Sequence, residues 1–309
     1  MSLHPVTPTL VCHYGAPASS AELRDGSIAL HLQLPHLAGS RRESLHLPGA
    51  ATVQRHGFLL MQSGELLLGV AMTEATGNLE PASARLYRQL LQASHGWHLY
   101  RVWNYVPGIN REEHGLECYR RFNVGRWQAF ESVYGRHLRS YLPAASAVGI
   151  HGNRLVVAFV AGRQPARYLE NPDQIPAYHY PDAYGPRSPG FSRAAMADCA
   201  GFDLAFISGT ASIRGHASVR VGDVLGQLEV TLDNLAIMGR QMGIDPLGDD
   251  GHGQWHLKCY LRHSDHLEQV RTRMIERLGH AAEDFIYLQA DICRRELDLE
   301  IEASRLVVG

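Results

Sequence analysis

The chain has 309 residues, with 29 Lys+Arg against 31 Asp+Glu and 18 His, so its formal net charge of −2 gives no electrostatic reason to expect nucleic acid or an anionic membrane as partner. Apolar residues make up 45 % and charged residues 19 %, which excludes a disordered chain and is typical of a globular protein with a sizeable core. Five scattered cysteines without a CxxC pair, no leader pattern and no apolar run of ~20 residues favour a cytoplasmic protein with reduced thiols, no metal site and no membrane span.

The first half alternates short strand-like and helical stretches. Alternation over 28–34 favours an edge strand, and a Ser-Gly turn at 63–64 predicts a hairpin. Leu86, Leu90 and Leu91 lie at helical spacing. The expected strands are 28–34, 57–62, 65–72 and 98–106, and the expected helices are 83–93 and 125–138.

The second half repeats the pattern more clearly. Residues 163–193 are rich in Pro, Tyr and Arg and too irregular for regular structure, and so long a loop is usually functional or disordered. The clearest helix spans 223–242, where leucines form one stripe and Gly243 follows as a stop. The expected strands are 155–161, 204–208, 256–261, 285–290 and 297–303, and a second helix is expected over 264–278.

This order predicts the α+β fold class, with helices packed on one face of mixed β-sheets. We expect two such units, an N-terminal domain over 1–148 and a C-terminal catalytic domain over 149–309. No glycine-rich nucleotide loop and no Gly-x-Ser-x-Gly elbow is present, which lowers the odds of a nucleotide site or a hydrolase triad.

Arginines and tyrosines cluster at 119–127 and 178–193. A guanidinium matches a carboxylate in a planar, bidentate way and a phenol adds a directional hydrogen bond, so these clusters suit a carboxylate-bearing substrate. Surface arginines stacked on exposed aromatics are an equally good interpretation.

Four acidic residues alternate with apolar ones near the C-terminus and share one face of a strand: Glu296, Asp298, Glu300 and Glu302. Such a face is ordinarily solvated. A partly buried carboxylate on it would have a raised pKa and could act as a general acid.

Four segments of the second half follow one another in the order of a known fold: 185–189, 204–210, 222–235 and 299–303. Over about residues 184–303 the chain resembles the Rid (reactive-intermediate deaminase) fold. Unusual strings extend the likeness to both halves: 104–110, 119–126, 184–194 and 207–213. The whole chain thereby resembles the chorismatase family of 3-hydroxybenzoate synthases and chorismate-hydrolysing enzymes, which implies two Rid-like (chorismate-mutase-like) units.

The resemblance implies a small-molecule substrate, chorismate, with two carboxylates, and no cofactor. Arg126 with Tyr119 looks like one family binding pair. Glu300 matches the family's catalytic carboxylate, which would protonate the enolpyruvyl methylene and release pyruvate. The second binding group is expected among Tyr178, Tyr184, Arg187 and Arg193.

Small residues at Ala211 and Cys293 look like the positions that shape the product in this family. They leave the branch open between 3-hydroxybenzoate, 4-hydroxybenzoate and a hydrolytic dihydroxy-dihydrobenzoate, and we favour a hydroxybenzoate. A Rid-type imine deaminase, with Arg294 or Arg295 before the last strand, and a non-catalytic ligand-binding module are the alternatives. A homo-oligomer also stays open.

Overall fold

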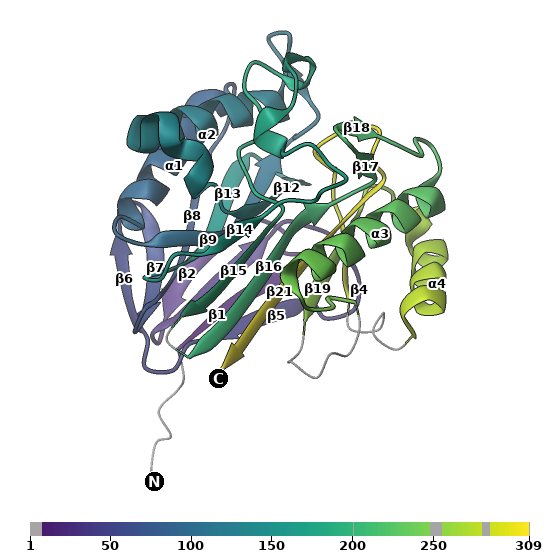
Figure 1. Cartoon of the computed structure of the whole chain (residues 1–309). Helices are drawn as coiled ribbons and strands as arrows, with labels where there is room; N and C mark the ends of the chain where they lie inside the picture. Colours follow the sequence, from purple (N-terminus) through teal and green to yellow (C-terminus); the bar gives the residue numbers. More distant parts are fainter. Residues whose placement is uncertain (1–7, 200, 248–254, 280–284, 309) are drawn as a thin grey trace.

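The computed structural model describes residues 8–199, 201–247, 255–279 and 285–308. A six-stranded mixed sheet forms the first unit, in the order β12-β9-β13-β8-β7-β6, with β9 and β12 parallel (Figure 1). Helices α1 (Leu79–Ala93) and α2 (Cys118–Tyr134) cover its outer face. The strands are β6 (Ala51–Arg55), β7 (Phe58–Ser63), β8 (Leu66–Glu74), β9 (His98–Pro107), β12 (Ala144–Ile150) and β13 (Arg154–Gly162).

A seven-stranded mixed sheet forms the second unit, in the order β14-β15-β16-β21-β19-β20-β4, with β19 and β20 parallel. Helices α3 (Val224–Met242) and α4 (Leu267–Leu278) cover its outer face. The strands are β4 (His36–Ala38), β14 (Arg167–Leu169), β15 (Ala194–Cys199), β16 (Phe202–Thr210), β19 (His256–Leu261), β20 (Ile286–Gln289) and β21 (Leu299–Val308).

The N-terminal segment adds a third, four-stranded sheet in the order β2-β3-β1-β5. The expected edge strand over 28–34 is wrong in one respect, because β3 is paired on both sides, with β2 and β1. The strands of this sheet are β1 (Thr9–Tyr14), β2 (Ser20–Arg24), β3 (Ser27–Leu32) and β5 (Arg42–His46).

Short elements lie outside the three sheets. Two pairs of short strands are β10 (Glu112–Glu113) with β11 (Leu116–Glu117) and β17 (Ile213–Arg214) with β18 (Ala217–Ser218). The 3-10 helices are η1 (Gly135–Tyr141), η2 (Ala177–His179), η3 (Asp182–Tyr184) and η4 (Ser264–His266).

The two large sheets have the same topology. In each, a hairpin, a helix, a strand, a second helix, a parallel strand and a last antiparallel strand follow one another, and the last strand lies in the middle of the sheet. β13 therefore corresponds to β21, and β9 to β19. The α+β class with helices on one face of mixed sheets is confirmed. The boundary predicted at 148/149 falls inside β12, and β13, which follows it, is paired with β8 and β9 of the first unit.

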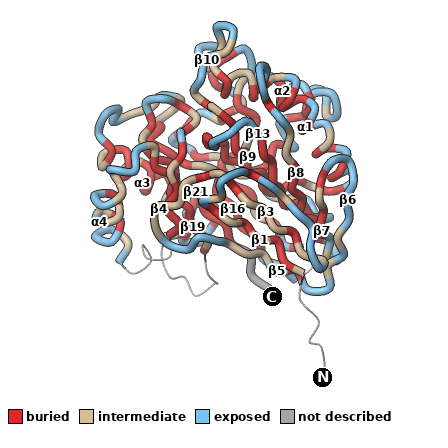
Figure 2. Tube along the Cα trace, turned by 180° about the vertical axis from the view of Figure 1, so that it is seen from behind, coloured by how far each residue is buried: buried red, intermediate tan, exposed pale blue. Residues whose placement is uncertain are grey.

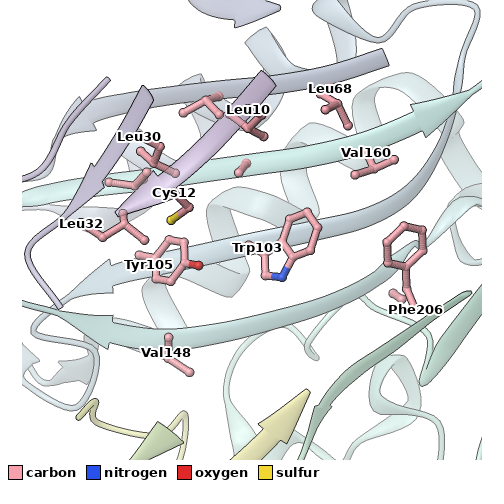
Figure 3. Packing of buried hydrophobic residues seen from close by; sticks show 14 of the residues in the cluster. Leu10, Cys12, Leu30, Leu32, Leu68, Trp103, Tyr105, Val148, Val160 and Phe206 are labelled. Atoms are coloured by element: carbon pink, nitrogen blue, oxygen red, sulfur yellow. The ribbon is translucent and has the colours of Figure 1, made fainter. Parts of the chain in front are cut away.

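The inner faces of the sheets enclose one shared core (Figure 2). Figure 3 shows Leu30 and Leu32 of the third sheet packing in the same layer as Tyr105 and Trp103 of β9. Phe206 of the second sheet meets the Trp103 ring edge-on, with ring centroids 6.3 Å apart. Each large sheet also has a core of its own, between its outer face and its two helices. From one side to the other the layers are helices, first large sheet, shared core, second large sheet and helices. In the described parts of the chain, no helix combines the length and the apolar character that crossing a membrane requires.

Single residues explain where helix α3 begins and ends and how closely helices α1 and α2 pack. Asp223 caps α3 by accepting from the Gly226 N–H at 2.9 Å, and Gly243 ends it in the left-handed region at φ 75°. Gly125 lets α2 approach α1, because a Cβ there would overlap the Ser83 hydroxyl and the Glu80 carbonyl. The irregular stretch predicted over 163–193 contains only β14 and two short 3-10 turns.

Candidate active site

A cavity of about 400 Å³ opens where the two units meet. The first unit contributes the β10–β11 hairpin and the start of α2, and the second contributes the irregular segment, the end of β16 and the approach to β21. The ionisable side chains in its wall are Glu112, Glu117, Tyr119, Arg120, Tyr180, Tyr184, Arg193, Cys293, Arg294, Arg295, Glu296 and Glu300.

Glu300 is a buried carboxyl in this wall, only 3 % exposed. No described residue donates a hydrogen bond to its Oε1 atom. Burial, with a smaller contribution from the charge of Glu302, raises the pKa of Glu300 to about 8, although Arg101 and Arg193 act against the rise. Glu300 is therefore protonated at neutral pH. The expectation that this strand face is solvated is wrong at Glu300 and Glu302, because a second sheet covers it.

Space for this carboxyl comes from an irregularity in β16. The pairing of β16 with β21 shifts register between Ile207 and Thr210. At Gly209, between them, a Cβ would overlap the Glu300 carboxyl group, so only glycine fits there without displacement. Ser208 fixes the backbone beside it, because its hydroxyl donates to the Ser192 carbonyl at 2.6 Å and accepts from the Ala145 N–H at 2.8 Å.

Two buried guanidinium groups line the same cavity, and each has a nitrogen without an acceptor among the described residues. Arg193 donates to the Tyr180 hydroxyl at 2.7 Å, and Arg294 donates to the His216 carbonyl at 2.8 Å. The Arg294 guanidinium also lies 4.1 Å from the centroid of the Tyr184 ring. Among the described residues nothing accepts from Nε of Arg193 or Nη2 of Arg294. Buried donors without acceptors are costly, so the pair is suited to an anionic ligand.

The other cavity residues predicted from the sequence are neutral groups. Burial raises the pKa of Tyr119, which therefore keeps its phenolic proton. Tyr184 donates its hydroxyl proton to the His216 carbonyl at 2.7 Å. Burial and the nearby Glu300 raise the pKa of Cys293 to about 12, so this group is a thiol, not a thiolate. Ala211 lies in the wall as a small apolar residue, 5 % exposed.

Three predicted binding residues lie outside the cavity wall. Arg126 is buried in the body of α2, where it donates to the Asn123 side chain at 3.0 Å and lies 5.1 Å from the Phe122 ring centroid. Arg187 is half-exposed on the Trp127 side of α2, and Tyr178 packs against the helix–sheet core of the first unit. Their binding role stays a prediction.

The structure adds Arg294 as a site residue that the binding prediction missed. Its sequence signal is a pair of arginines just before the last strand, which the sequence analysis used only for the deaminase alternative. No described group of three or more His, Cys, Asp or Glu side chains is arranged to hold a metal ion.

Known proteins resemble the chain in sequence and in structure. Residues 44–161 match the family model described as "Chorismatase FkbO/Hyg5-like, N-terminal". A chorismatase from Streptomyces hygroscopicus is 39 % identical over 80 % of this chain and 74 % of its own length. A 3-hydroxybenzoate synthase from the same organism is 35 % identical over 81 % of this chain and 76 % of its own.

A solved chorismatase has the same fold, with a TM-score of 0.85 and 32 % identity over 96 % of this chain and 92 % of that one. Sequence and structure both match over most of the length, including the half that carries the buried acid. The chain therefore belongs to the chorismatase family.

Proposed function

We propose that this protein is an enzyme that converts chorismate into pyruvate and a hydroxybenzoate. The single observation that carries the proposal is a buried Glu300, whose pKa burial raises to about 8, in the wall of one cavity with two guanidinium groups that each have a nitrogen without an acceptor among the described residues. The names of its relatives, chorismatase and 3-hydroxybenzoate synthase, support the same substrate.

Glu300 acts as the general acid. It gives its proton to the methylene carbon of the enolpyruvyl group, which leaves positive charge on the ether carbon and its oxygen. A carboxyl whose pKa is near 8 holds this proton at neutral pH and releases it when charge develops nearby. Proton transfer of this kind contributes ~10²–10⁴-fold in rate.

Arg193 and Arg294 bind the two carboxylates of the substrate. Each residue lines the cavity and has a guanidinium nitrogen without an acceptor among the described residues, while other atoms of the group are fixed by protein acceptors or ring contacts. Charge-assisted hydrogen bonds of this type are worth ~1.5–3 kcal/mol each. Tyr119 adds a neutral donor to the cavity wall from the first unit.

The product depends on which ring oxygen is lost. If the ring carbon–ether bond breaks and a ring proton leaves, pyruvate and 4-hydroxybenzoate form. If water adds at the ether carbon and the ring then loses its hydroxyl as water, pyruvate and 3-hydroxybenzoate form, with no net water consumed. A diol is the product if the ring keeps both oxygens. Ala211 and Cys293 line the cavity and shape this choice by the room that they leave.

Incubation of the purified protein with chorismate, followed by chromatography of the products, tests the proposal. Wild-type protein should release pyruvate and a hydroxybenzoate, and Glu300→Gln should bind chorismate but release no pyruvate. Glu276→Gln, a matched change at a half-exposed carboxylate on α4, should behave as wild type. Turnover by Glu300→Gln contradicts the mechanism. Unchanged chorismate with the wild-type protein contradicts the activity and leaves imine deamination or simple binding.

A further inference from the structure

A second carboxylate, Glu302, lies behind the cavity between the two large sheets and does not line it. Its Oε2 atom accepts from Arg101 Nη2 at 2.7 Å and from the Ser146 hydroxyl at 2.5 Å. Its Oε1 atom accepts from the Trp103 indole at 2.9 Å and from Lys258 Nζ at 2.8 Å. Burial favours the neutral form, but Lys258, Arg101 and these hydrogen bonds lower the pKa of Glu302 to about 2. Glu302 is thus ionised at neutral pH.

Glu302 and Glu300 are two residues apart on β21 and project from the same face of the strand. The residues between and beside them pack instead against the helices of the second unit, namely Leu299, Ile301 and Ala303. One carboxylate of the pair is saturated with donors, and the other has none on its Oε1 atom. Two carboxyl groups with such different surroundings differ in charge at neutral pH: Glu300 is neutral and Glu302 is negative.

We propose that Glu302 is a positioning residue for the reaction: its carboxylate pairs with Arg101 and Lys258 and so prevents them from stabilising an ionised Glu300, which keeps its proton until the substrate takes it. This inference rests on the proposed role of Glu300 as the acid. Arg101 is the decisive cation, because it lies within electrostatic reach of Glu300 and has an Nη1 atom with no acceptor among the described residues. Without Glu302, this guanidinium would serve Glu300 as its counter-ion.

The charges near this pair are balanced without Glu300. Lys258 also contacts Glu43 at 2.8 Å, so Arg101 and Lys258 are matched by Glu302 and Glu43. An ionised Glu300 would therefore find no unmatched cation in this buried cluster, and the cations that remain for it are Arg193 and Arg294 in the cavity wall, where the substrate binds in the proposed function. Other titratable or charged groups around Glu300 come from each neighbouring element: Tyr119 of α2, Arg193 before β15, Tyr260 opposite it on β19, and Cys293 and Arg294 before β21. Tyr119, Tyr260 and Cys293 stay neutral, since burial raises the pKa of each.

Two substitutions should move the titration of Glu300 in opposite directions. Glu302→Gln keeps the side-chain shape but removes the negative charge and frees Arg101, so the pKa of Glu300 should fall. Lys258→Met leaves the charge of Glu302 less neutralised, so the pKa of Glu300 should rise. A role that is only structural would impair both variants without opposite shifts.

The titration is read in two ways. The infrared carbonyl band that Glu300→Gln removes reports the proton on Glu300 without any turnover, and the pH profile of kcat reports it during the reaction. Each pH unit by which the pKa falls below the assay pH lowers the protonated fraction about tenfold. For Glu302→Gln we therefore expect at least about a tenfold loss of kcat at pH 8, recovery toward pH 5, and little change in KM.

The double variant Glu302→Gln/Lys258→Met removes one charge of each sign and covers the case in which a single variant does not fold. It should still show the lowered pKa of Glu300, because Arg101 remains. If the Glu300 band and the pH profile stay where they are in the wild type, the inference is overturned. That outcome is distinct from failure of the proposed function, which would appear as turnover in Glu300→Gln.

Discussion

Replacing Glu300 by Gln should change how the stability of the protein depends on pH. The carboxyl has an ordinary pKa of 4.5 when unfolded and about 8 when folded. Between these values the folded state binds the proton more tightly than the unfolded state. Stability from this group is fully present below pH 4.5 and is lost as pH rises through 8.

The size of the loss follows from the same two values. Each pH unit in this window costs ~1.4 kcal/mol, so about 3 kcal/mol is lost between pH 4.5 and pH 7. Gln cannot ionise, and Glu300→Gln should therefore escape this loss. Relative to wild type, the variant should gain about 3 kcal/mol in the free energy of unfolding over that interval.

Urea denaturation at half-unit steps from pH 4.5 to 8.5 measures this difference. All other groups, including the acid-labile contribution of Glu302, are common to both proteins and cancel. Glu276→Gln, at a half-exposed carboxylate, should keep the wild-type slope. Parallel profiles for wild type and Glu300→Gln would refute the reasoning, because they would mean that Glu300 ionises in the folded protein as freely as in the unfolded chain.

Three further outcomes are expected. Gly209→Ala should lower the rate of pyruvate release by ~10²-fold or more, the contribution of a general acid, because the added methyl group displaces the Glu300 carboxyl. A chromatographic assay, with a thermal melt to check folding, measures this, and full activity would contradict the packing. Arg294→Met should raise KM for chorismate about 10–100-fold, corresponding to one charged hydrogen bond; if Arg187→Met does so instead, the binding group is Arg187, outside the cavity wall, and not Arg294. Gly125→Ala should destabilise the protein by ~1–3 kcal/mol in urea denaturation because its methyl group overlaps α1, and an unchanged midpoint would show that the helices separate freely.

Much of the fold could be predicted from hydrophobic periodicity. The apolar runs of β8, β9 and β13 and the leucine stripe of α3 lie within a few residues of their expected positions. The start of α2 could not be predicted, since it begins at Cys118 rather than near 125. No side chain caps its N-terminus and its first two turns are rich in arginine, so neither usual signal of a helix start is present.

The site was predictable where a residue belongs to a family pattern and not where it depends on packing. The family resemblance predicts Glu300 as a site residue, whereas the alternation of acidic and apolar residues predicts a strand face exposed to solvent. Only the sheet from the first unit, which brings Arg101, Trp103 and Ser146 onto this face, makes it dry. The position of Arg126 also depends on packing: its guanidinium lies inside the first unit, against Phe122, and its predicted binding role stays a prediction.

The matching topology of the two large sheets has a consequence for how many substrate molecules one chain binds. β13 occupies in the first unit the place that β21 occupies in the second, yet its residues from Leu155 to Ala161 are all apolar. The first unit thus carries no acid from Leu155 to Ala161 of the corresponding strand and contributes wall residues, among them Tyr119, to the cavity. The two units thus share a topology but differ at this strand position, where the second unit has the carboxyl of Glu300 and the first has apolar side chains. Calorimetric titration of Glu300→Gln with chorismate should accordingly end at one equivalent per chain.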